Sequence, residues 1–257
     1  MLTALTRAVS TSLADCALSF QERRPIDVGL AMRQHASYES YLRSQGIHVV
    51  SLPAEPDLPD SVFVEDTAVV VDELAVMSAP RLDSRRREVP SVAAALGRFR
   101  RVETLEAATM LEGGDVMRIG RTLYVGLSER TNGDGIAQLA GLLAPFDYRV
   151  KAVEFAHCLH LKSACTYVGQ GTILVNQDWV DVSQLDGLDV VDVAPDERAA
   201  ANALWVSDRV LLPGSFPATR DRLERAGFLV DSIDVSELQK AEAGVTCCSI
   251  LFEADFD

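Results

Sequence analysis

The sequence places one imidazole, a pair of thiols and several carboxylates at the starts of apolar, strand-like segments. Cys247 and Cys248 stand in GVTCCSILF, His160 opens HLKSAC, and Glu112 lies in LEGGDV. A cysteine is nucleophilic as its thiolate, which needs an imidazole or another electropositive partner near neutral pH. A carboxylate behind the imidazole would fix its tautomer and support its positive charge. These residue types together predict covalent catalysis by a cysteine.

Of the two cysteines, Cys247 is the better candidate for the nucleophile. If GVTCCSILF is an extended strand, successive side chains point to opposite faces. Cys248 then shares a face with Ile250 and Phe252, which are large and apolar and indicate a packed side. Cys247 shares its face with Ser249 and could line a cavity. The alternative is that both cysteines are structural, because free cysteine usually packs as a small hydrophobic side chain.

Three further carboxylates, of Asp60, Glu65 and Asp66, lie at the start of a hairpin in DSVFVEDTAVV. Acidic residues at loop starts are usually solvated caps, and the two glycines after Glu112 usually allow a tight turn. Each of these observations is weak alone, but their combination with a thiol and an imidazole indicates a site.

A zinc site is another interpretation of the segment around the histidine. Four residues there are of types that bind zinc: His157, Cys158, His160 and Cys165. Their spacing matches no familiar zinc pattern, and alternation along a strand would divide them between two faces. We therefore expect no metal.

The elements that must position these residues recur along the chain. Four segments consist of an apolar strand, a tight polar turn and a second apolar strand: TAVVVDELAVMSAP, DVMRIGRTLYVGLS, CTYVGQGTILVNQ and NALWVSDRVLLPGS. Glycine and aspartate in their turns suit hairpins. The spacing of about forty to fifty residues is typical of a repeat architecture.

Helix-like segments follow, over 27–44, 129–143 and 219–226, and single strands come after helices in HVVSLPA, RRVETL, YRVKAVEF and FLVDSIDV. A fifth hairpin has only TCCSILF at the C-terminal end, so we expect the N-terminal strand LTALTRAV to pair with it and close a ring. No long Pro- or Ser-rich linker divides the chain. We expect one α/β domain over residues 1–257, with a central channel.

Composition restricts the class of protein. The chain has 257 residues, 48% of them hydrophobic, and a formal net charge of -14, which disfavours nucleic acid as a partner. Five cysteines form no disulfide framework and fit a reducing compartment. The N-terminus lacks the uninterrupted apolar core of a secretory signal, and no apolar run is long enough to span a membrane. We expect a cytoplasmic protein.

Seven segments resemble one family in the same order: SVFVEDTAVV, SRRREV, LEGGDV, GLSERTN, HLKSAC, AANALWV and TCCS. They are similar to segments of the dimethylarginine dimethylaminohydrolases, and the resemblance extends from about Arg7 to Phe252. It implies the five-bladed α/β propeller, or pentein, of the guanidine-modifying superfamily, in agreement with the repeat count. It also implies hydrolysis of N-omega-methylated arginine to citrulline and methylamine or dimethylamine, without a cofactor.

The resemblance assigns roles to the candidate catalytic residues. Cys247 attacks the guanidinium carbon, and His160 protonates the departing amine. The product of this step is a covalent thiouronium intermediate, which water activated by His160 releases as citrulline. Glu112 matches the carboxylate that orients the histidine or bonds the guanidinium. Asp66 matches the carboxylate that bonds the guanidinium nitrogens.

The resemblance also implies how the rest of a substrate is bound. Arg85, with Arg86 as a rival, and Arg130 match residues that hold an α-carboxylate. Leu18 matches a leucine on a flap over the substrate, and the backbone near Ala241 matches a late-loop contact. The full set of implied substrate-binding residues is Leu18, Asp60, Glu65, Asp66, Arg85, Arg130 and Ala241. The expected partner is a small molecule, with no nucleic acid, no membrane and a homodimer as one option.

Two alternatives remain at this point. An arginine deiminase of the same superfamily has an aspartate two residues after the histidine, where this chain has Lys162, and its F-x-R-D loop is here Phe63 to Asp66 with glutamate in third place. Both departures favour the methylarginine branch. A non-enzymatic, ribosome-associated protein with the same fold needs no cysteine, histidine and glutamate together, and the net charge of -14 suits ribosomal RNA poorly.

Overall fold

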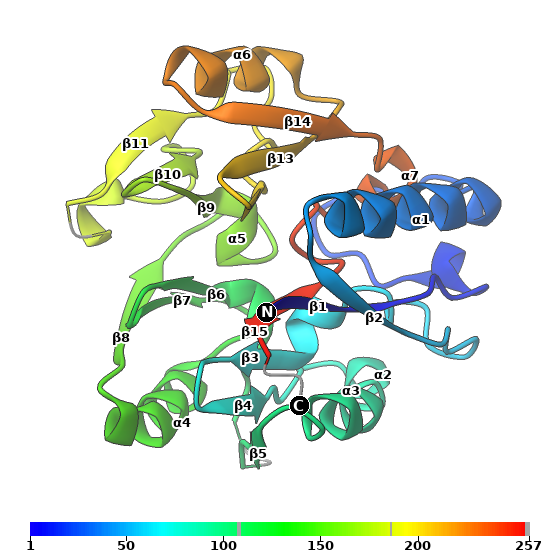
Figure 1. Cartoon of the computed structure of the whole chain (residues 1–257), viewed down its shortest axis with the longest axis vertical. Helices are drawn as coiled ribbons and strands as arrows, with labels where there is room; N and C mark the ends of the chain where they lie inside the picture. Colours follow the sequence, from blue (N-terminus) through cyan, green and yellow to red (C-terminus); the bar gives the residue numbers. More distant parts are fainter. Residues whose placement is uncertain (107–108, 186, 255–257) are drawn as a thin grey trace.

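The computed structural model describes residues 1–106, 109–185 and 187–254 and consists of five small sheets arranged in a ring (Figure 1). Each sheet, or blade, has three strands. In order, the blades are β15 (Ile250–Glu253), β1 (Leu2–Arg7) and β2 (His48–Leu52); β3 (Ala68–Val70), β4 (Leu74–Met77) and β5 (Arg101–Thr104); β6 (Val116–Ile119), β7 (Thr122–Leu127) and β8 (Arg149–Glu154); β9 (Cys165–Gly169), β10 (Thr172–Val175) and β11 (Asp189–Asp192); β12 (Leu204–Val206), β13 (Arg209–Pro213) and β14 (Leu229–Ile233). The predicted five-bladed α/β propeller is confirmed.

All five blades share one pairing pattern. The first two strands of each blade pair antiparallel, and the second and third pair parallel. We call β15, β3, β6, β9 and β12 the inner strands. Residues of all five inner strands line a cavity of about 250 Å³, which is the predicted central channel.

The hairpin turns within the blades follow from residues that tolerate positive φ. Ser207 and Asp208 have φ of 49° and 62° between β12 and β13. Two consecutive residues with positive φ are typical of the hairpin turn whose twist matches that of the strands. Gly120, with φ of 58°, begins the corresponding turn between β6 and β7.

Helices connect the hairpins to the outer strands in four blades, and Figure 1 shows α3, α4 and α6 at the periphery of the ring. Asp27 and Asn132 accept hydrogen bonds from Leu30 N and Gly135 N and so cap α1 and α4. The helices are α1 (Val28–Ser44), α2 (Asp83–Arg86), α3 (Val89–Leu96), α4 (Gly133–Leu143), α5 (Leu161–Ala164), α6 (Pro217–Arg225) and α7 (Ser236–Gln239), with one-turn 3₁₀ helices η1 (Leu13–Asp15), η2 (Val64–Thr67), η3 (Gly113–Asp115), η4 (Ala144–Phe146) and η5 (Val182–Gln184).

The sequence analysis was wrong at several elements, and it predicted no helix at α3, Val89–Leu96. It did not find β11, whose four residues Asp189–Asp192 follow η5 rather than a full helix. It also placed both cysteines of TCCSILF in a strand, but β15 begins only at Ile250. The residues before it form a turn in which Ser249 N donates to Thr246 O. The alternation that selected Cys247 therefore does not exist in the fold.

Short turns stand directly before the inner strands and bring the loops of different blades together. The helical turns η2, η3 and α5 end where β3, β6 and β9 begin, and η3 contacts both η2 and α5. We call these segments, together with those before β12 and β15, the entry turns. The three predicted catalytic residues, Glu112, His160 and Cys247, lie on them, as do Glu65 and Asp66.

The chain ends close the ring as predicted. Strand β1 pairs with β15, Leu5 opposite Ile250, and the Met1 amino group donates to Ala254 O at 2.7 Å. Leu5 and Ile250 are buried in a hydrophobic cluster with Met77 of the next blade. Among the helices of the described residues, none combines the length and the apolar content that crossing a membrane would need.

Candidate active site

His160 lies at the centre of the entry turns, between two carboxylates. Its Nε2 is 2.9 Å from Oε2 of Glu112, and its Nδ1 is 3.7 Å from Oδ1 of Asp66. All three side chains are buried. Burial alone would lower the pKa of His160, but Asp66 and the hydrogen bond with Glu112 outweigh it and raise this pKa to about 9. The imidazole is therefore protonated at neutral pH and can donate a proton.

Two arginines neutralise the outer oxygens of the same carboxylates. Arg85 Nη1 donates to Asp66 Oδ2 at 2.8 Å, and Arg130 Nη1 to Glu112 Oε1 at 3.4 Å. Burial would raise the pKa of both carboxyl groups, but the charge of His160 and its hydrogen bond with Glu112 hold each pKa below its ordinary value. Both carboxylates stay ionised, with one oxygen toward an arginine and the other toward the imidazole.

The two glycines after Glu112 are required by close packing rather than by a turn with positive φ. A Cβ at Gly114 would lie 2.5 Å from both Asp66 Oδ1 and His160 Nδ1, and a Cβ at Gly113 would collide with the backbone carbonyl of Glu65. Gly114 N also donates to Asp66 Oδ1 at 3.0 Å. The pair thus lets three entry turns approach closely enough to form the site.

Asp115 is a site residue that the sequence analysis did not assign, although it belongs to LEGGDV. Its buried carboxylate accepts hydrogen bonds from Leu161 N at 2.9 Å and Ser128 Oγ at 2.6 Å. Because Leu161 follows His160 directly, Asp115 fixes the start of α5 and the backbone that carries the imidazole.

Cys247 and His160 line the same cavity, which has a volume of about 20 Å³, room for about one water molecule. Cys247 is half-buried, whereas Cys248 is fully buried in a hydrophobic cluster. Burial, with Glu65 and Asp66 nearby, raises the pKa of Cys247 to about 12, although Gly244 N donates to its Sγ at 3.4 Å. The thiol is therefore protonated until a positive charge approaches it.

Most of the predicted site residues meet at this cavity. Those that line it are Asp60, Asp66, Arg85, Arg130, His160, Ala241 and Cys247. Glu112 lies behind His160. Arg86 is not among the lining residues, and its guanidinium bonds Pro80 O and Asp83 instead.

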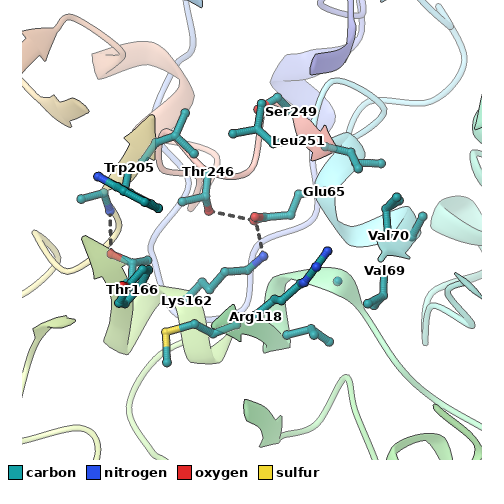
Figure 2. A pocket seen from close by; sticks show the side chains of 18 residues that line it. Glu65, Val69, Val70, Arg118, Lys162, Thr166, Trp205, Thr246, Ser249 and Leu251 are labelled. Atoms are coloured by element: carbon teal, nitrogen blue, oxygen red, sulfur yellow. Dashed lines mark hydrogen bonds and ion pairs between the residues drawn. The ribbon is translucent and has the colours of Figure 1, made fainter. Parts of the chain in front are cut away.

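Two predicted substrate contacts lie elsewhere. The half-buried Leu18 packs against a hydrophobic cluster that includes Leu13. The Glu65 carboxylate lines the central channel, where it bonds Lys162 Nζ at 2.5 Å and Thr246 Oγ1 at 2.8 Å (Figure 2). Sequence spacing could not separate Glu65 from Asp66, because adjacent residues on a 3₁₀ turn point in different directions.

A flap over the cavity is held by side chains of the site. Ala17 N donates to the Asp60 carboxylate at 3.2 Å, and Arg130 Nη2 to Ser19 Oγ at 3.1 Å. The backbone N–H groups of residues 19–21 all donate to the Glu242 carboxylate, at 2.5 to 3.0 Å. No pattern in the sequence indicated Glu242.

The residues that could hold a metal differ from those considered from the sequence. In the described part of the chain, the ligand atoms that lie within 4.8 Å of one another belong to Asp66, Glu112 and His160, and not to the histidine and cysteine quartet. Arg85 and Arg130 already compensate both carboxylates, which favours an imidazolium over a cation between them. Three carboxylates, of Asp60, Asp66 and Glu242, line the cavity together with three cations, of Arg85, Arg130 and the protonated His160.

Comparison with known proteins gives one consistent result. A family model described as N,N dimethylarginine dimethylhydrolase, eukaryotic, matches residues 15–207. The chain is 32% identical over 250 residues to the N(G),N(G)-dimethylarginine dimethylaminohydrolase of Pseudomonas aeruginosa, with 96% of this chain and 98% of that protein covered. It is 36% identical over 255 residues to the protein of the same name from Streptomyces coelicolor, with 99% and 98% covered.

Solved structures are similar over nearly the whole chain. One is a Pseudomonas aeruginosa DDAH with a cysteine replaced by serine, complexed with citrulline (TM-score 0.93, 31% identity, 98% of this chain and 100% of that chain). Another is a dimethylarginine dimethylaminohydrolase with a histidine replaced by glycine, in an adduct with S-methyl-L-thiocitrulline (TM-score 0.93, 31% identity, 98% and 100%). The N-terminal domain of a cyanobacterial arginine dihydrolase shares the fold at 19% identity (TM-score 0.87, 97% and 97%).

Proposed function

The chain belongs to the dimethylarginine dimethylaminohydrolase family, and we propose that it hydrolyses N-omega-methylated arginines to citrulline and methylamine or dimethylamine. The observation that supports this most directly is that Cys247 and a protonated His160 line one small cavity with the Asp66 carboxylate. That arrangement offers a nucleophile, a proton donor and an anion for a guanidinium within one enclosed volume.

The proposed reaction has two steps. Binding of the guanidinium beside Cys247 places a positive charge next to the thiol, lowers its pKa and allows the thiol to lose its proton to solvent water. The thiolate forms a bond to the guanidinium carbon, and His160 gives its proton to the methylated nitrogen as that C–N bond breaks. The amidino group then remains on sulfur as a thiouronium, and the neutral amine departs.

The second step uses the same imidazole in its neutral form. His160 removes a proton from water as the hydroxide adds to the same carbon. The C–S bond then breaks and the added hydroxyl gives its proton to the leaving sulfur, which releases citrulline and the neutral Cys247 thiol. Glu112 keeps the imidazole in place and supports its positive charge in both steps. The relatives with a cysteine or a histidine replaced, which were captured with citrulline or as a thiocitrulline adduct, support these assignments.

The amino-acid end of the substrate is proposed to lie under the flap. Arg130 and Arg85 would bind the α-carboxylate, and Asp60 would bind the α-ammonium. The backbone at Ala241 and the flap that contains Leu18 would cover it. Since Glu65 bonds Lys162 on the channel side, its proposed role is support of the cavity wall rather than contact with substrate.

Lys162 is the residue on which we base the choice between methylated arginine and arginine as the substrate. At this position the related arginine deiminases place a carboxylate that holds the second side of an unmethylated guanidinium. Here the side chain is an ammonium that pairs with Glu65, and it does not line the cavity that contains Cys247. The guanidinium therefore keeps one carboxylate partner in the cavity, Asp66, and its other side is left for methyl groups.

One assay tests the proposed function. The purified protein is incubated with asymmetric dimethylarginine and, separately, with arginine, and citrulline is measured against time. We expect a higher kcat/KM for the methylated substrate, because arginine would bind without its second partner. A preference for arginine would assign the chain to the deiminase branch, and citrulline from neither substrate would contradict the hydrolase function.

We also propose a cytoplasmic location and a single catalytic unit over the whole chain. All five cysteines are free thiols, as expected of a reducing compartment. A homodimer is a further proposal, which sedimentation of the purified protein would test.

A further inference from the structure

The repeat of the fold points to a residue that the proposed mechanism does not use. Four of the five entry turns contribute one group each to the site: Asp66 before β3, Glu112 before β6, His160 before β9 and Cys247 before β15. The corresponding segment of the fifth blade is AAN, and its polar residue is Asn202, two residues before β12. Asn202 is buried, so its amide must find partners inside the protein.

The partners of Asn202 are in the turn that carries the nucleophile. Its Oδ1 accepts a hydrogen bond from Thr246 N at 3.0 Å, and its Nδ2 donates to Thr246 Oγ1 at 2.9 Å. Nδ2 also donates to Lys162 O at 3.1 Å. One side chain therefore holds the residue directly before Cys247 and the backbone two residues after His160.

Asn202 also packs against the donor to the thiol. A Cβ at position 244 would fall within the van der Waals radius of the Asn202 amide, so only glycine fits there. Gly244 N donates to Cys247 Sγ at 3.4 Å. The Asn202 amide thus contacts both Gly244 and Thr246, which lie within the three residues before Cys247 in the chain.

Further polar contacts join Asn202, Thr246, Glu65 and Lys162 into a closed hydrogen-bonded cycle. Thr246 Oγ1 donates to Glu65 Oε2 at 2.8 Å, and Lys162 Nζ binds Glu65 Oε1 at 2.5 Å. Figure 2 shows Thr246 and Lys162 both reaching Glu65 among the side chains that line the central channel. The backbone of Lys162 then returns to Asn202. The four residues belong to four different blades. The hydrogen-bonded cycle therefore connects the turn that carries Cys247 to the entry turn of His160.

We propose that Asn202 is a positioning residue for the nucleophile, which holds the turn from Gly244 to Cys247 in register with the entry turn of His160. The inference rests on the proposed role of Cys247. Asn202 does not line the cavity that contains Cys247, so it acts through Thr246 and Gly244 and not on the substrate.

Asn202→Ala tests this role by steady-state kinetics with asymmetric dimethylarginine. We expect kcat to fall by about 10- to 100-fold, because an error of about 1 Å in the position of a reacting group can have that effect. KM should change by less than about threefold, since the substrate contacts remain. Asn202→Asp should also lose activity, because it keeps the acceptor for Thr246 N but loses both donors.

A substrate-free measurement separates this inference from the proposed function. Iodoacetamide alkylation of Cys247, followed by mass spectrometry of its peptide, should slow by about fivefold in Asn202→Ala, because the Gly244 N–H that stabilises the thiolate loses its support. If the unmodified protein makes no citrulline, the proposed function fails, while the alkylation rates still decide the role of Asn202.

Asn176→Ala is the matched control. Asn176 is also buried, and its amide joins two segments through Arg198 O at 2.9 Å and Asp178 N at 3.1 Å, away from the cavity. It should lose stability without loss of kcat. If Asn202→Ala does not fold, Thr246→Val removes the hydroxyl of the same hydrogen-bonded cycle and should lower kcat. The proposal would be overturned if a folded Asn202→Ala kept its alkylation rate and its kcat within about twofold of the unmodified protein. It would also be overturned if Asn176→Ala lost as much kcat and as much alkylation rate as Asn202→Ala.

Discussion

The charge of His160 determines how a single imidazole can serve both proposed steps. With Glu112 on one ring nitrogen and Asp66 near the other, the pKa of about 9 makes the resting form the imidazolium. Cys247, with a pKa near 12, is then a neutral thiol in the free protein. The resting site therefore holds a protonated acid and a neutral thiol, and a cationic substrate favours ionisation of the thiol.

Replacement of each cysteine separates chemistry from packing. Cys247→Ser should abolish citrulline formation with the fold intact, because a serine hydroxyl without a strong base is a poor nucleophile. Cys248→Ser should keep kcat and lower the free energy of unfolding by about 1–3 kcal/mol, since Cys248 is fully buried among apolar side chains. Turnover and urea unfolding of both variants check this. Equal loss of turnover in two folded variants would contradict the assignment of Cys247.

The raised pKa of His160 predicts a dependence of stability on pH. The pKa rises from about 6.5 in the unfolded chain to about 9 in the fold, so the stabilisation is fully present below pH 6.5 and is lost as the pH rises through 9. Its size is about 3 kcal/mol.

Urea unfolding of the unmodified protein and of His160→Gln at pH 6 and pH 9.5 measures the stabilisation that comes from the protonation of His160. The unmodified protein should lose more free energy of unfolding between the two pH values than the variant does, by up to about 3 kcal/mol. Other titrating groups are common to both proteins and cancel in the difference. A pH dependence identical in both would mean that folding does not raise the pKa of His160.

At the level of elements, the flap of residues 17–21 must open before a substrate can enter a cavity of about 20 Å³. In the structure the flap is fastened by Glu242, whose backbone is left-handed with φ of 59° and whose carboxylate accepts from three consecutive N–H groups. These bonds are near the surface, so we expect them to govern the equilibrium between open and closed flap rather than the stability of the whole fold.

Glu242→Ala should therefore act on binding more than on chemistry. Loss of the fastening should raise KM for dimethylarginine by about 5- to 10-fold, the equivalent of about 1 kcal/mol, with a smaller effect on kcat. Hydrogen exchange at the amides of residues 19–21 should accelerate. Glu224→Ala, which removes an exposed pair with Arg220, is the control and should change neither quantity. An unchanged KM together with unchanged exchange would show that the flap does not depend on Glu242.

Elements with local determinants could be predicted from the sequence, and those fixed by distant contacts could not. The helix Val28–Ser44 and the turn at Ser207 and Asp208 follow from a cap, an apolar stripe and residues that accept positive φ. The turn before β15 does not: its residues have strand-like composition, but Asn202 and Glu65 take the polar groups of Thr246. Cys247 is the more accessible of the two thiols, but the strand alternation on which its selection was based is absent from the fold.

At the scale of the whole molecule, the ring explains why residues from all parts of the chain meet. Four of the five entry turns place a functional group at one cavity or directly behind it, and the fifth places Asn202 against the turn that carries Cys247. The repeat in the sequence predicted the ring of five blades. It did not predict how each entry turn is rotated, which decides the side chains that face the cavity. Glu65 and Asp66 are adjacent in sequence yet lie on opposite sides of the wall between channel and cavity.

Closure of the ring by the chain ends predicts that the point of closure can be moved. The first blade is assembled from the last strand, β15, paired antiparallel with the first, β1, which pairs parallel with β2. The fifth blade has the same pairing, β12 with β13 and β13 with β14, but its first pair is joined by the exposed turn at Ser207 and Asp208.

A circular permutant is opened between Ser207 and Asp208, and a short glycine linker joins Ala254 to Met1. Its fifth blade then has the connectivity that the first blade has now. Met1 and Ala254 already exchange hydrogen bonds, so the linker spans a short distance. We expect cooperative unfolding and citrulline formation within about tenfold of the unmodified protein, since exposed turn tips tolerate new termini. A permutant opened within α5, between Leu161 and Lys162, should lose activity because it releases His160. Loss of both fold and activity in the first permutant would show that the ring depends on its natural order of synthesis and closure.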